Sequence, residues 1–366
     1  MRHLYIIGNG FDLAHGLETS YHHFLMWYLN KRWDYINENQ QKSINDDDNL
    51  IRLQRTKFGI SITIEGEIRS VQDFKDNVQK IGDESGNPVN ITYSSLLKEI
   101  LDRDEKEGWA DIESTYYNLM VGIATGNTSI LNQSKKSSIE VLNNSMNTLK
   151  KELEFYLTSQ VLPKIQYVQV KDEIKKIFSW IFHDYEEDER PCILNFNYTG
   201  TFESVYLEGL HHINIVNIHG VAGLYPIIFG YGDEMDVHFK DLENTNDNQF
   251  LKNLKSFGYL QSDDYKKILV FLSFDNDFKV HLIGHSLGLS DRLLLNTIFE
   301  HKNCKKIEIH YSNEMNDFDR LIINLSRHFN LEMKGAMRQK VVPLIGAIPM
   351  DKEPLYGEGS SNSKYL

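Results

Sequence analysis

The sequence predicts an α/β protein with a doubly wound, mostly parallel sheet and a mainly helical insertion. Three observations indicate this class. The chain opens with a short apolar run that a glycine turn closes, and further apolar runs alternate with helical segments after Pro191. Between these two parts lies a polar stretch, residues 34–188, in which helical periodicity dominates. Strands that alternate with helices are typical of a parallel sheet covered on both faces.

The first element is a strand that leads into a turn and a helix. The apolar run at residues 4–7 is followed by Gly-Asn-Gly, which predicts a buried strand ending in a tight turn. Thr19 and Ser20 can cap the next helix, because their side-chain oxygens accept hydrogen bonds from its first N–H groups. Apolar residues then recur at helical spacing from Phe24 to Leu29. This order is the first half of a β–α–β unit.

Residues 34–188 are rich in Asn, Asp, Gln, Ser and Lys, and we interpret them as a mainly helical insertion with long surface loops. The acidic run at residues 46–48 predicts a solvated loop, because it lacks the ligand spacing and the glycine of a calcium loop. Isoleucines that alternate with polar residues between positions 60 and 68 predict a small strand. Helices are predicted at residues 93–101, 112–123, 139–157 and 165–182.

Strand signals return after Pro191, and the first strand is expected to join these later strands across the insertion. Residues 1–33 and 189–335 would then form one discontinuous α/β domain. Residues 336–366 form an extension whose tail, from Gly357, is polar and predicted to be disordered. Strands are predicted at residues 192–196, 215–218, 227–229, 280–283 and 307–311, and helices at about 200–210, 247–257, 290–300 and 314–328.

Composition and charge narrow the class of protein. The 366-residue chain has a formal net charge of −13, which disfavours nucleic acid as a partner, since a phosphate backbone needs clustered Lys and Arg. Two cysteines, Cys192 and Cys304, are too few for a disulfide scaffold or a four-cysteine zinc site, and we expect no metal site. The chain shows neither a signal peptide nor a transmembrane run, so we expect a cytoplasmic protein with no membrane partner.

Ligands of open α/β sheets bind beyond the carboxyl ends of the strands, so the turns after the predicted strands are the candidate sites. The first strand ends in YIIGNGFD (5–12). Gly8 and Gly10 would let the backbone of the turn, together with Asn9, approach a pyrophosphate and donate N–H groups to it. Asp12 is a candidate ligand of a ribose hydroxyl, or it caps the next turn. The third glycine of a dinucleotide fingerprint is missing, so a turn that only permits positive φ stays the alternative.

Two later strands also end in polar residues. Asn197 follows the strand at 192–196, where its amide would orient a water or a sugar hydroxyl, or form an Asx turn. The next strand runs into NIHG, which presents His219 beside Gly220. Histidine titrates near neutral pH, so His219 is a candidate general base, with a structural histidine as the alternative.

The last strong turn is HLIGHSLGLSD (281–291). Gly284, Ser286 and Gly288 match the GxSxG nucleophile elbow, which makes Ser286 a candidate acyl-transfer nucleophile. Several strands precede this turn and few residues follow it, which disfavours the elbow.

The WADIE segment (109–113) brings two carboxylates, Asp111 and Glu113, close to a tryptophan. These two carboxylates would reach the sugar of a ligand bound at the strand ends if the insertion folded over the sheet as a lid. An acidic first turn of a helix is the alternative, because carboxylates stabilise the positive end of a helix.

These segments, taken together and in order, resemble the AbiH family of phage abortive-infection proteins, from residue 4 to about 300. IGNGFD and GHSLGLSD are the most specific parts. The arrangement is more distantly similar to sirtuin-like NAD-binding domains, although their four zinc cysteines are absent here. That resemblance implies a glycine turn at Gly8 and Gly10, a catalytic Asn197, a His-Gly pair at His219 and Gly220, and a late turn at Gly284 and Ser286. On this resemblance Ser286 would be a ligand of a phosphate or ribose and not a nucleophile, and Asp12 or Asp291 would bond ribose hydroxyls.

The resemblance implies an antiphage effector that cleaves the glycosidic bond of NAD or a related nucleotide. Asn197 would hold the attacking water and His219 would take its proton, with NAD as substrate and no further cofactor. A nucleotide, a phage-derived trigger and further copies of the chain are the expected partners. Two alternatives stay open: a serine hydrolase built on Ser286, and a non-catalytic nucleotide-binding sensor.

Overall fold

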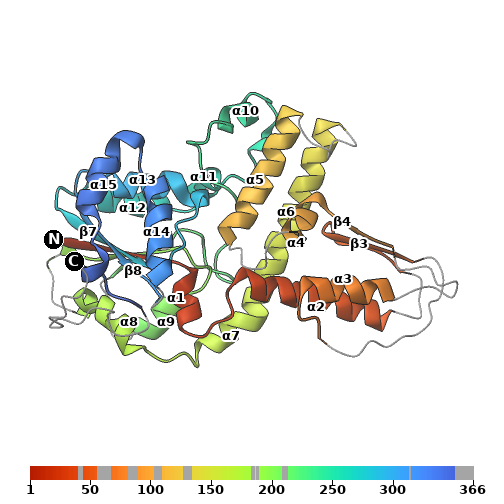
Figure 1. Cartoon of the computed structure of the whole chain (residues 1–366), viewed down its shortest axis with the longest axis horizontal. Helices are drawn as coiled ribbons and strands as arrows, with labels where there is room; N and C mark the ends of the chain where they lie inside the picture. Colours follow the sequence, from red (N-terminus) through yellow and green to blue (C-terminus); the bar gives the residue numbers. More distant parts are fainter. Residues whose placement is uncertain are drawn as a thin grey trace.

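The computed structural model divides into an α/β lobe around a central sheet and a mainly helical lobe beside it (Figure 1). Among the described residues, no helix combines the length and the apolar character needed to span a bilayer. The expected strand at 60–64 and the tail from Gly357 lie outside the described residues. The structure describes residues 1–39, 44–55, 67–80, 90–102, 109–126, 134–182, 186, 189–207, 213–312 and 315–350.

The central sheet confirms the predicted fold class. Its five strands are all parallel and stand in the order β6–β5–β1–β7–β8. The chain adds two strands on one side of β1 and then two on the other, so the strand order switches between β1 and β7. A crevice for a ligand is expected at such a switch. The strands are β1 (Arg2–Ile7), β5 (Cys192–Asn195), β6 (Asn214–Asn217), β7 (Phe278–Ile283) and β8 (Cys304–His310).

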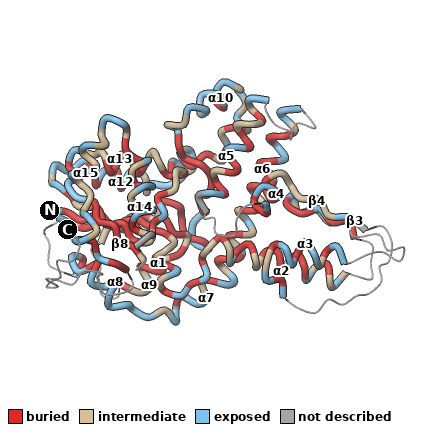
Figure 2. Tube along the Cα trace, in the orientation of Figure 1, coloured by how far each residue is buried: buried red, intermediate tan, exposed pale blue. Residues whose placement is uncertain are grey.

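Each face of the sheet has its own apolar core, because successive side chains of a strand point to opposite faces. Leu4 and Ile6 belong to one core, and Tyr5 and Ile7 belong to the other. Figure 2 shows the buried residues concentrated along this sheet. The first face is covered by α12 (Asp264–Ser273), α13 (Arg292–Phe299) and α14 (Met315–Arg327), with α15 (Lys334–Lys340) near β8, and the second by α1 (Asn9–Ala14), α8 (Asp172–Ile177) and α9 (Thr201–Tyr206).

The predicted strand at 227–229 is wrong. Its backbone is irregular, and the N–H of Ile228 donates to the carbonyl of His219 at 2.8 Å, so the chain folds back at the end of β6. Ile227 and Phe229 are buried in the helical lobe instead. The apolar run therefore reflects burial against helices and not membership of the sheet.

Two predicted helices are broken in the structure. The segment 165–182 contains the end of α7 (Leu162–Ile165), then α8, then a 3₁₀ turn at Ser179–Phe182. The segment 247–257 holds a 3₁₀ turn at Asn248–Phe250 and the beginning of α11 (Lys255–Gly258). Apolar spacing alone did not reveal these breaks.

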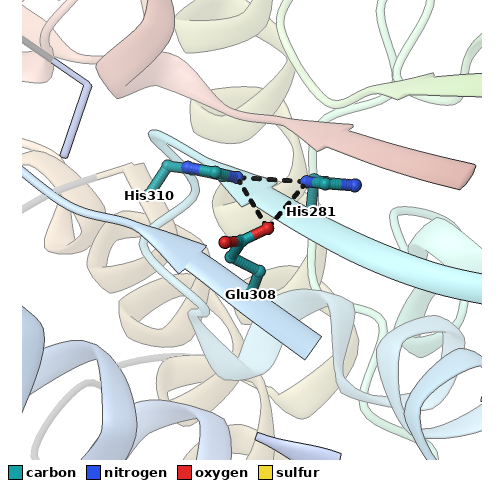
Figure 3. A group of neighbouring side chains, drawn as sticks. All are labelled: His281, Glu308 and His310. Atoms are coloured by element: carbon teal, nitrogen blue, oxygen red, sulfur yellow. Dashed lines mark hydrogen bonds and ion pairs between the residues drawn. The ribbon is translucent and has the colours of Figure 1, made fainter. Parts of the chain in front are cut away.

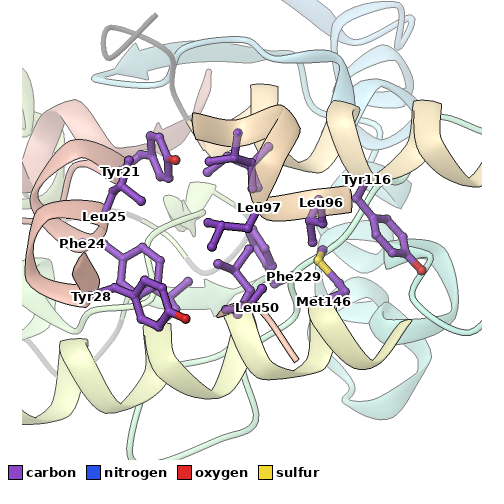
Figure 4. Close-up of a cluster of buried hydrophobic side chains, with 14 of the residues drawn as sticks. Tyr21, Phe24, Leu25, Tyr28, Leu50, Leu96, Leu97, Tyr116, Met146 and Phe229 are labelled. Carbon is purple, nitrogen blue, oxygen red and sulfur yellow. The ribbon is translucent and has the colours of Figure 1, made fainter. Parts of the chain in front are cut away.

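The helical lobe contains most of the helices predicted for the insertion. Its core includes Phe24, Leu97, Tyr116, Met146 and Phe229 (Figure 4). This core also draws in the helix before the insertion and the chain after β6, and the domain boundaries stay a prediction. The helices are α2 (Tyr21–Glu38), α3 (Val71–Lys80), α4 (Ser95–Leu101), α5 (Trp109–Thr125), α6 (Lys135–Tyr156) and α10 (Phe239–Glu243). The predicted cap of α2 is confirmed, because Ser20 Oγ accepts a hydrogen bond from the N–H of His23 at 3.2 Å.

The acidic run at residues 46–48 is not the solvated loop that we predicted. It forms the end of a strand in a small antiparallel sheet and the turn that follows. The buried guanidinium of Arg32 pairs with Asp46 and Asp48, and Tyr28 donates to Asp48 Oδ2 at 2.8 Å. A buried cation therefore explains the run. The strands are β2 (Ile44–Asp47), β3 (Ile51–Arg55) and β4 (Asn90–Tyr93).

Candidate functional site

The turns after β1, β5, β6 and β7 line one cavity of about 960 Å³, beyond the carboxyl ends of the strands. Nine of the ten residues predicted for the site are in its wall, and Gly220 is not. Asp111 and Glu113 of α5 line the same cavity, so the helical lobe contributes to it. The nine residues are Gly8, Asn9, Gly10, Asp12, Asn197, His219, Gly284, Ser286 and Asp291.

The two glycine turns at the strand switch contact each other through their backbones. A Cβ at Gly8 would lie 2.5 Å from the Cα of His285, and Gly284 has a φ of +64°. The N–H of Gly8 donates to Ile283 O at 2.9 Å, and that of Gly10 to Gly284 O at 2.8 Å. These two N–H groups already have acceptors in the protein, so the structure does not offer them to a phosphate. The glycines instead let β1 and β7 approach closely at the base of the cavity.

Gly220 is also required by the backbone conformation and by a close contact with a neighbouring segment. Its φ is +77°, and a Cβ there would lie 2.3 Å from the carbonyl oxygen of Pro226. Any larger residue would be strained and would collide with the returning chain. Gly220 thus shapes the turn that presents His219, from a position outside the cavity wall.

Asp12 is a buried carboxyl group with one oxygen unsatisfied. Its Oδ2 accepts a hydrogen bond from Thr199 Oγ1 at 2.6 Å, while its Oδ1 is buried without a hydrogen-bond partner. Burial raises the pKa of Asp12 to about 6, although the side chains of Thr199, Thr201 and Asn197 act in the opposite direction. Buried polar atoms normally have partners, so an orphaned oxygen in a cavity wall points to a ligand or a water.

The two asparagines around Phe196 have different tasks. Asn195 holds the turn: its Oδ1 accepts from the N–H of Asn197 at 3.0 Å, and its Nδ2 donates to Thr199 O and to Asn217 Oδ1. Asn197 lines the cavity, where its side chain favours the ionised form of Asp12. The turn therefore uses Asn195, while the side chain of Asn197 interacts with Asp12 in the cavity wall.

His219 lies in the wall, but the protein engages both of its ring nitrogens. Nδ1 faces Phe196 O at 3.0 Å, and Nε2 faces Asp291 Oδ1 at 3.0 Å. Tyr198 and Tyr259 stack on the ring. The predicted role as a general base stays a prediction, and it requires Nε2 to exchange Asp291 for a ligand or water.

A buried charge network that the sequence did not predict lies beside His219. Lys255 of α11 has a side chain only 1% exposed, and its Nζ lies 2.9 Å from Glu113 Oε2 and 3.0 Å from Asp291 Oδ1. Burial opposes the charge of Asp291, yet Lys255 holds the pKa of Asp291 well below its usual range. Burial raises the pKa of Glu113 even beside this lysine. Lys255 belongs to no motif, and only the fold brings it to the two carboxylates.

Ser286 is exposed at the mouth of the cavity. Among the described residues, no hydrogen bond joins its hydroxyl to a histidine. The adjacent His285 is buried, its Nδ1 accepts from the N–H of Leu287 at 3.0 Å, and burial lowers its pKa to about 3. The Ser–His contact on which a nucleophile elbow depends is therefore not formed at Ser286.

Comparison with known protein families assigns the chain to a family. A family model described as "Bacteriophage abortive infection AbiH" matches residues 4–313, which is most of the chain. Neither curated proteins nor solved structures include a significant match. The strand order is that of doubly wound nucleotide-binding folds in general and does not single out sirtuins, so that likeness stays a prediction.

Proposed function

The chain belongs to the AbiH family of bacteriophage abortive-infection proteins, and we propose that it acts in this defence by hydrolysing the glycosidic bond of NAD or a related nucleotide. The bond would be cleaved in the cavity at the strand switch. Water adds to the anomeric carbon of the ribose, and the base leaves with the electron pair of the broken bond.

One observation carries this proposal: the orphaned Oδ1 of Asp12 in the cavity wall. A ribose hydroxyl is a hydrogen-bond donor of the kind that this oxygen lacks. A carboxyl group with a pKa of about 6 also takes up a proton near neutral pH, as a general base must. Asp12 would therefore accept the proton of a ribose hydroxyl or of the attacking water. Such a group typically contributes about 100- to 10,000-fold in rate.

The charges of the wall suit the transition state of this reaction. Breaking the bond leaves positive charge on the sugar ring, which nearby carboxylates stabilise. The cationic side chains in the wall, Lys255 and Arg320, are each paired with carboxylates. The carboxyl groups outnumber them, and they belong to Asp12, Asp111, Glu113, Asp291 and Asp317.

Asn197 and His219 complete the proposed site. Asn197 would orient the water, because its amide lines the cavity close to Asp12. His219 would join only by exchanging Asp291 for the ligand, as its ring nitrogens are both engaged. The late turn with Ser286 would contact the ligand at the cavity mouth.

The test combines a purified protein and infected cells. Full-length chain is incubated with NAD and with nucleosides, and the released base is measured by chromatography. NAD is also followed in cells during phage infection. We expect Asp12→Asn and Asn197→Ala to abolish release of the base and protection. Ser286→Ala serves as the matched control, with an unchanged kcat and at most a raised KM.

Other outcomes would decide against the proposal. Fluorophosphonate labelling that disappears in Ser286→Ala, together with lost protection, would identify a serine hydrolase. Ligand binding without turnover, and unchanged cellular nucleotides while wild-type cells survive infection, would identify a sensor.

A further inference from the structure

Three potential metal ligands converge on the face of the sheet that carries Tyr5. His281 of β7 and Glu308 and His310 of β8 point toward one another (Figure 3). His281 Nδ1 lies 3.1 Å from His310 Nε2 and 3.3 Å from Glu308 Oε2. His310 Nε2 lies 3.8 Å from the same oxygen. In a tetrahedral zinc site, ligand atoms at about 2.0–2.1 Å from the ion lie roughly 3.3 Å apart.

The outer ring nitrogens of the two histidines have neighbours that can accept their protons. His310 Nδ1 faces the carbonyl oxygen of Ile348 at 2.9 Å, so it must donate. His281 Nε2 faces His3 Nδ1 at 2.9 Å and can donate to it. Neutral imidazoles protonated at these outer positions present lone pairs at the inner ones. Outer N–H groups held by acceptors are the usual support of metal-bound histidines.

The cluster is buried and negatively charged at its centre. His281, Glu308 and His310 are each at most 5% exposed. Their three potential ligand atoms therefore meet inside the protein, around the carboxylate of Glu308.

We propose that His281, Glu308 and His310 bind a divalent transition-metal ion of the zinc type. Imidazole and carboxylate ligands suit Zn²⁺ and Fe²⁺ better than they suit Mg²⁺ or Ca²⁺. The expectation of no metal site came from cysteine counts and local spacing. The ligands of this site come from two strands, and only the register of the sheet brings them together.

Lys279 of β7 gives the proposal a sharp test. Its ammonium pairs with the same carboxylate oxygen, Glu308 Oε2, that would bind the ion. It is therefore a competing cation, and the side chain is partly exposed, so it can move away. His310 also lines the large cavity, which provides a route for the ion.

The experiment measures metal content and affinity in the full-length chain. Protein stripped with chelator is dialysed against Zn²⁺, its content is measured by mass spectrometry, and Co²⁺ serves as an optical probe. We expect one ion per chain in the wild type and in the control His238→Gln, which replaces an exposed histidine that is not part of the cluster. Glu308→Gln and His310→Gln should weaken binding by about 100-fold or more. Lys279→Met should strengthen it by about tenfold, because a like charge is removed.

Two results would overturn the proposal. One is a wild type that, after dialysis against Zn²⁺, contains no more of the ion than the protein that was stripped with chelator and not dialysed against Zn²⁺. The other is equal uptake by the wild type and Glu308→Gln, which would assign the ion to another place. If the ligand variants fail to fold, Lys279→Met still tests the proposal. Unchanged or weaker Zn²⁺ binding in that variant would contradict the idea that Lys279 and the ion compete for the Glu308 carboxylate.

Discussion

Replacing Asp12 by Asn should change how stability depends on pH. The pKa of this carboxyl is raised from 3.8 to about 6 by burial. The folded protein therefore binds its proton more tightly than the unfolded chain does. Ionising Asp12 above about pH 6 destabilises the fold by about 3 kcal/mol. This penalty decreases as the pH falls from 6 towards 3.8, the pKa of the carboxyl in the unfolded chain. The variant lacks the titration, so the penalty should be absent from it.

The measurement is chemical unfolding of the wild type and Asp12→Asn between about pH 4.5 and pH 7.5, followed by tryptophan fluorescence. The free energy of unfolding of the wild type, relative to the variant, should rise by about 2 kcal/mol as the pH falls over this range. Asp291→Asn is the control without a slope in this range. The pKa of Asp291 is depressed in the fold, so its stabilisation is lost only as the pH falls below the unfolded pKa of 3.8.

The difference in free energy of unfolding between wild type and Asp12→Asn would be the same at about pH 4.5 and pH 7.5 if the carboxyl titrated alike in the folded and unfolded states. That result would mean that a partner satisfies Oδ1 in the fold and offsets the effect of burial. The proposed ribose contact would then lose its basis.

Three further predictions concern the frame of the site, each measured as the free energy of unfolding. Lys255→Met leaves two carboxylates buried without a countercharge, so it should cost about 3–5 kcal/mol; a loss below 1 kcal/mol would contradict the network. Gly284→Ala places a Cβ 2.2 Å from a backbone nitrogen and should cost far more than Gly16→Ala, which has a similar φ but open space and should cost about 1–2 kcal/mol. Asn195→Ala should cost about 1–3 kcal/mol more than Asn197→Ala, because only Asn195 holds the turn; equal losses would refute that division.

Local signals predicted the sheet and the cavity wall well. The strand at residues 4–7 and the Ser20 cap rest on local signals, and each was predicted correctly, whereas the predicted tight turn after the strand is the beginning of α1. The turns that carry Asn197 and His219 follow strands of one parallel sheet. Because the carboxyl ends of such strands meet at one edge, predicting the strands was enough to bring these turns together.

Partners distant in sequence were not predictable. Lys255 lies in the segment 247–257, whose predicted helix gave no sign of a carboxylate partner, and only tertiary packing makes it the countercharge of Glu113 and Asp291. The expected strand at 227–229 failed for a related reason: its apolar side chains pack on helices contributed by a different part of the chain. His281 and Glu308 are neighbours through cross-strand register, which no local pattern encodes.

Lys255 pairs both with Glu113, on helix α5 of the insertion, and with Asp291 of the α/β lobe. These two ion pairs connect the lobes. Any movement of α5 away from the sheet would separate Glu113 from Lys255 and leave Asp291 as the remaining carboxylate of that ammonium; breaking one such buried pair typically costs about 3–5 kcal/mol. The position of the insertion and the charge balance beside His219 are thus linked. A molecule that bound the outer surface of the insertion and moved α5 would therefore alter the Glu113–Lys255 ion pair without entering the cavity.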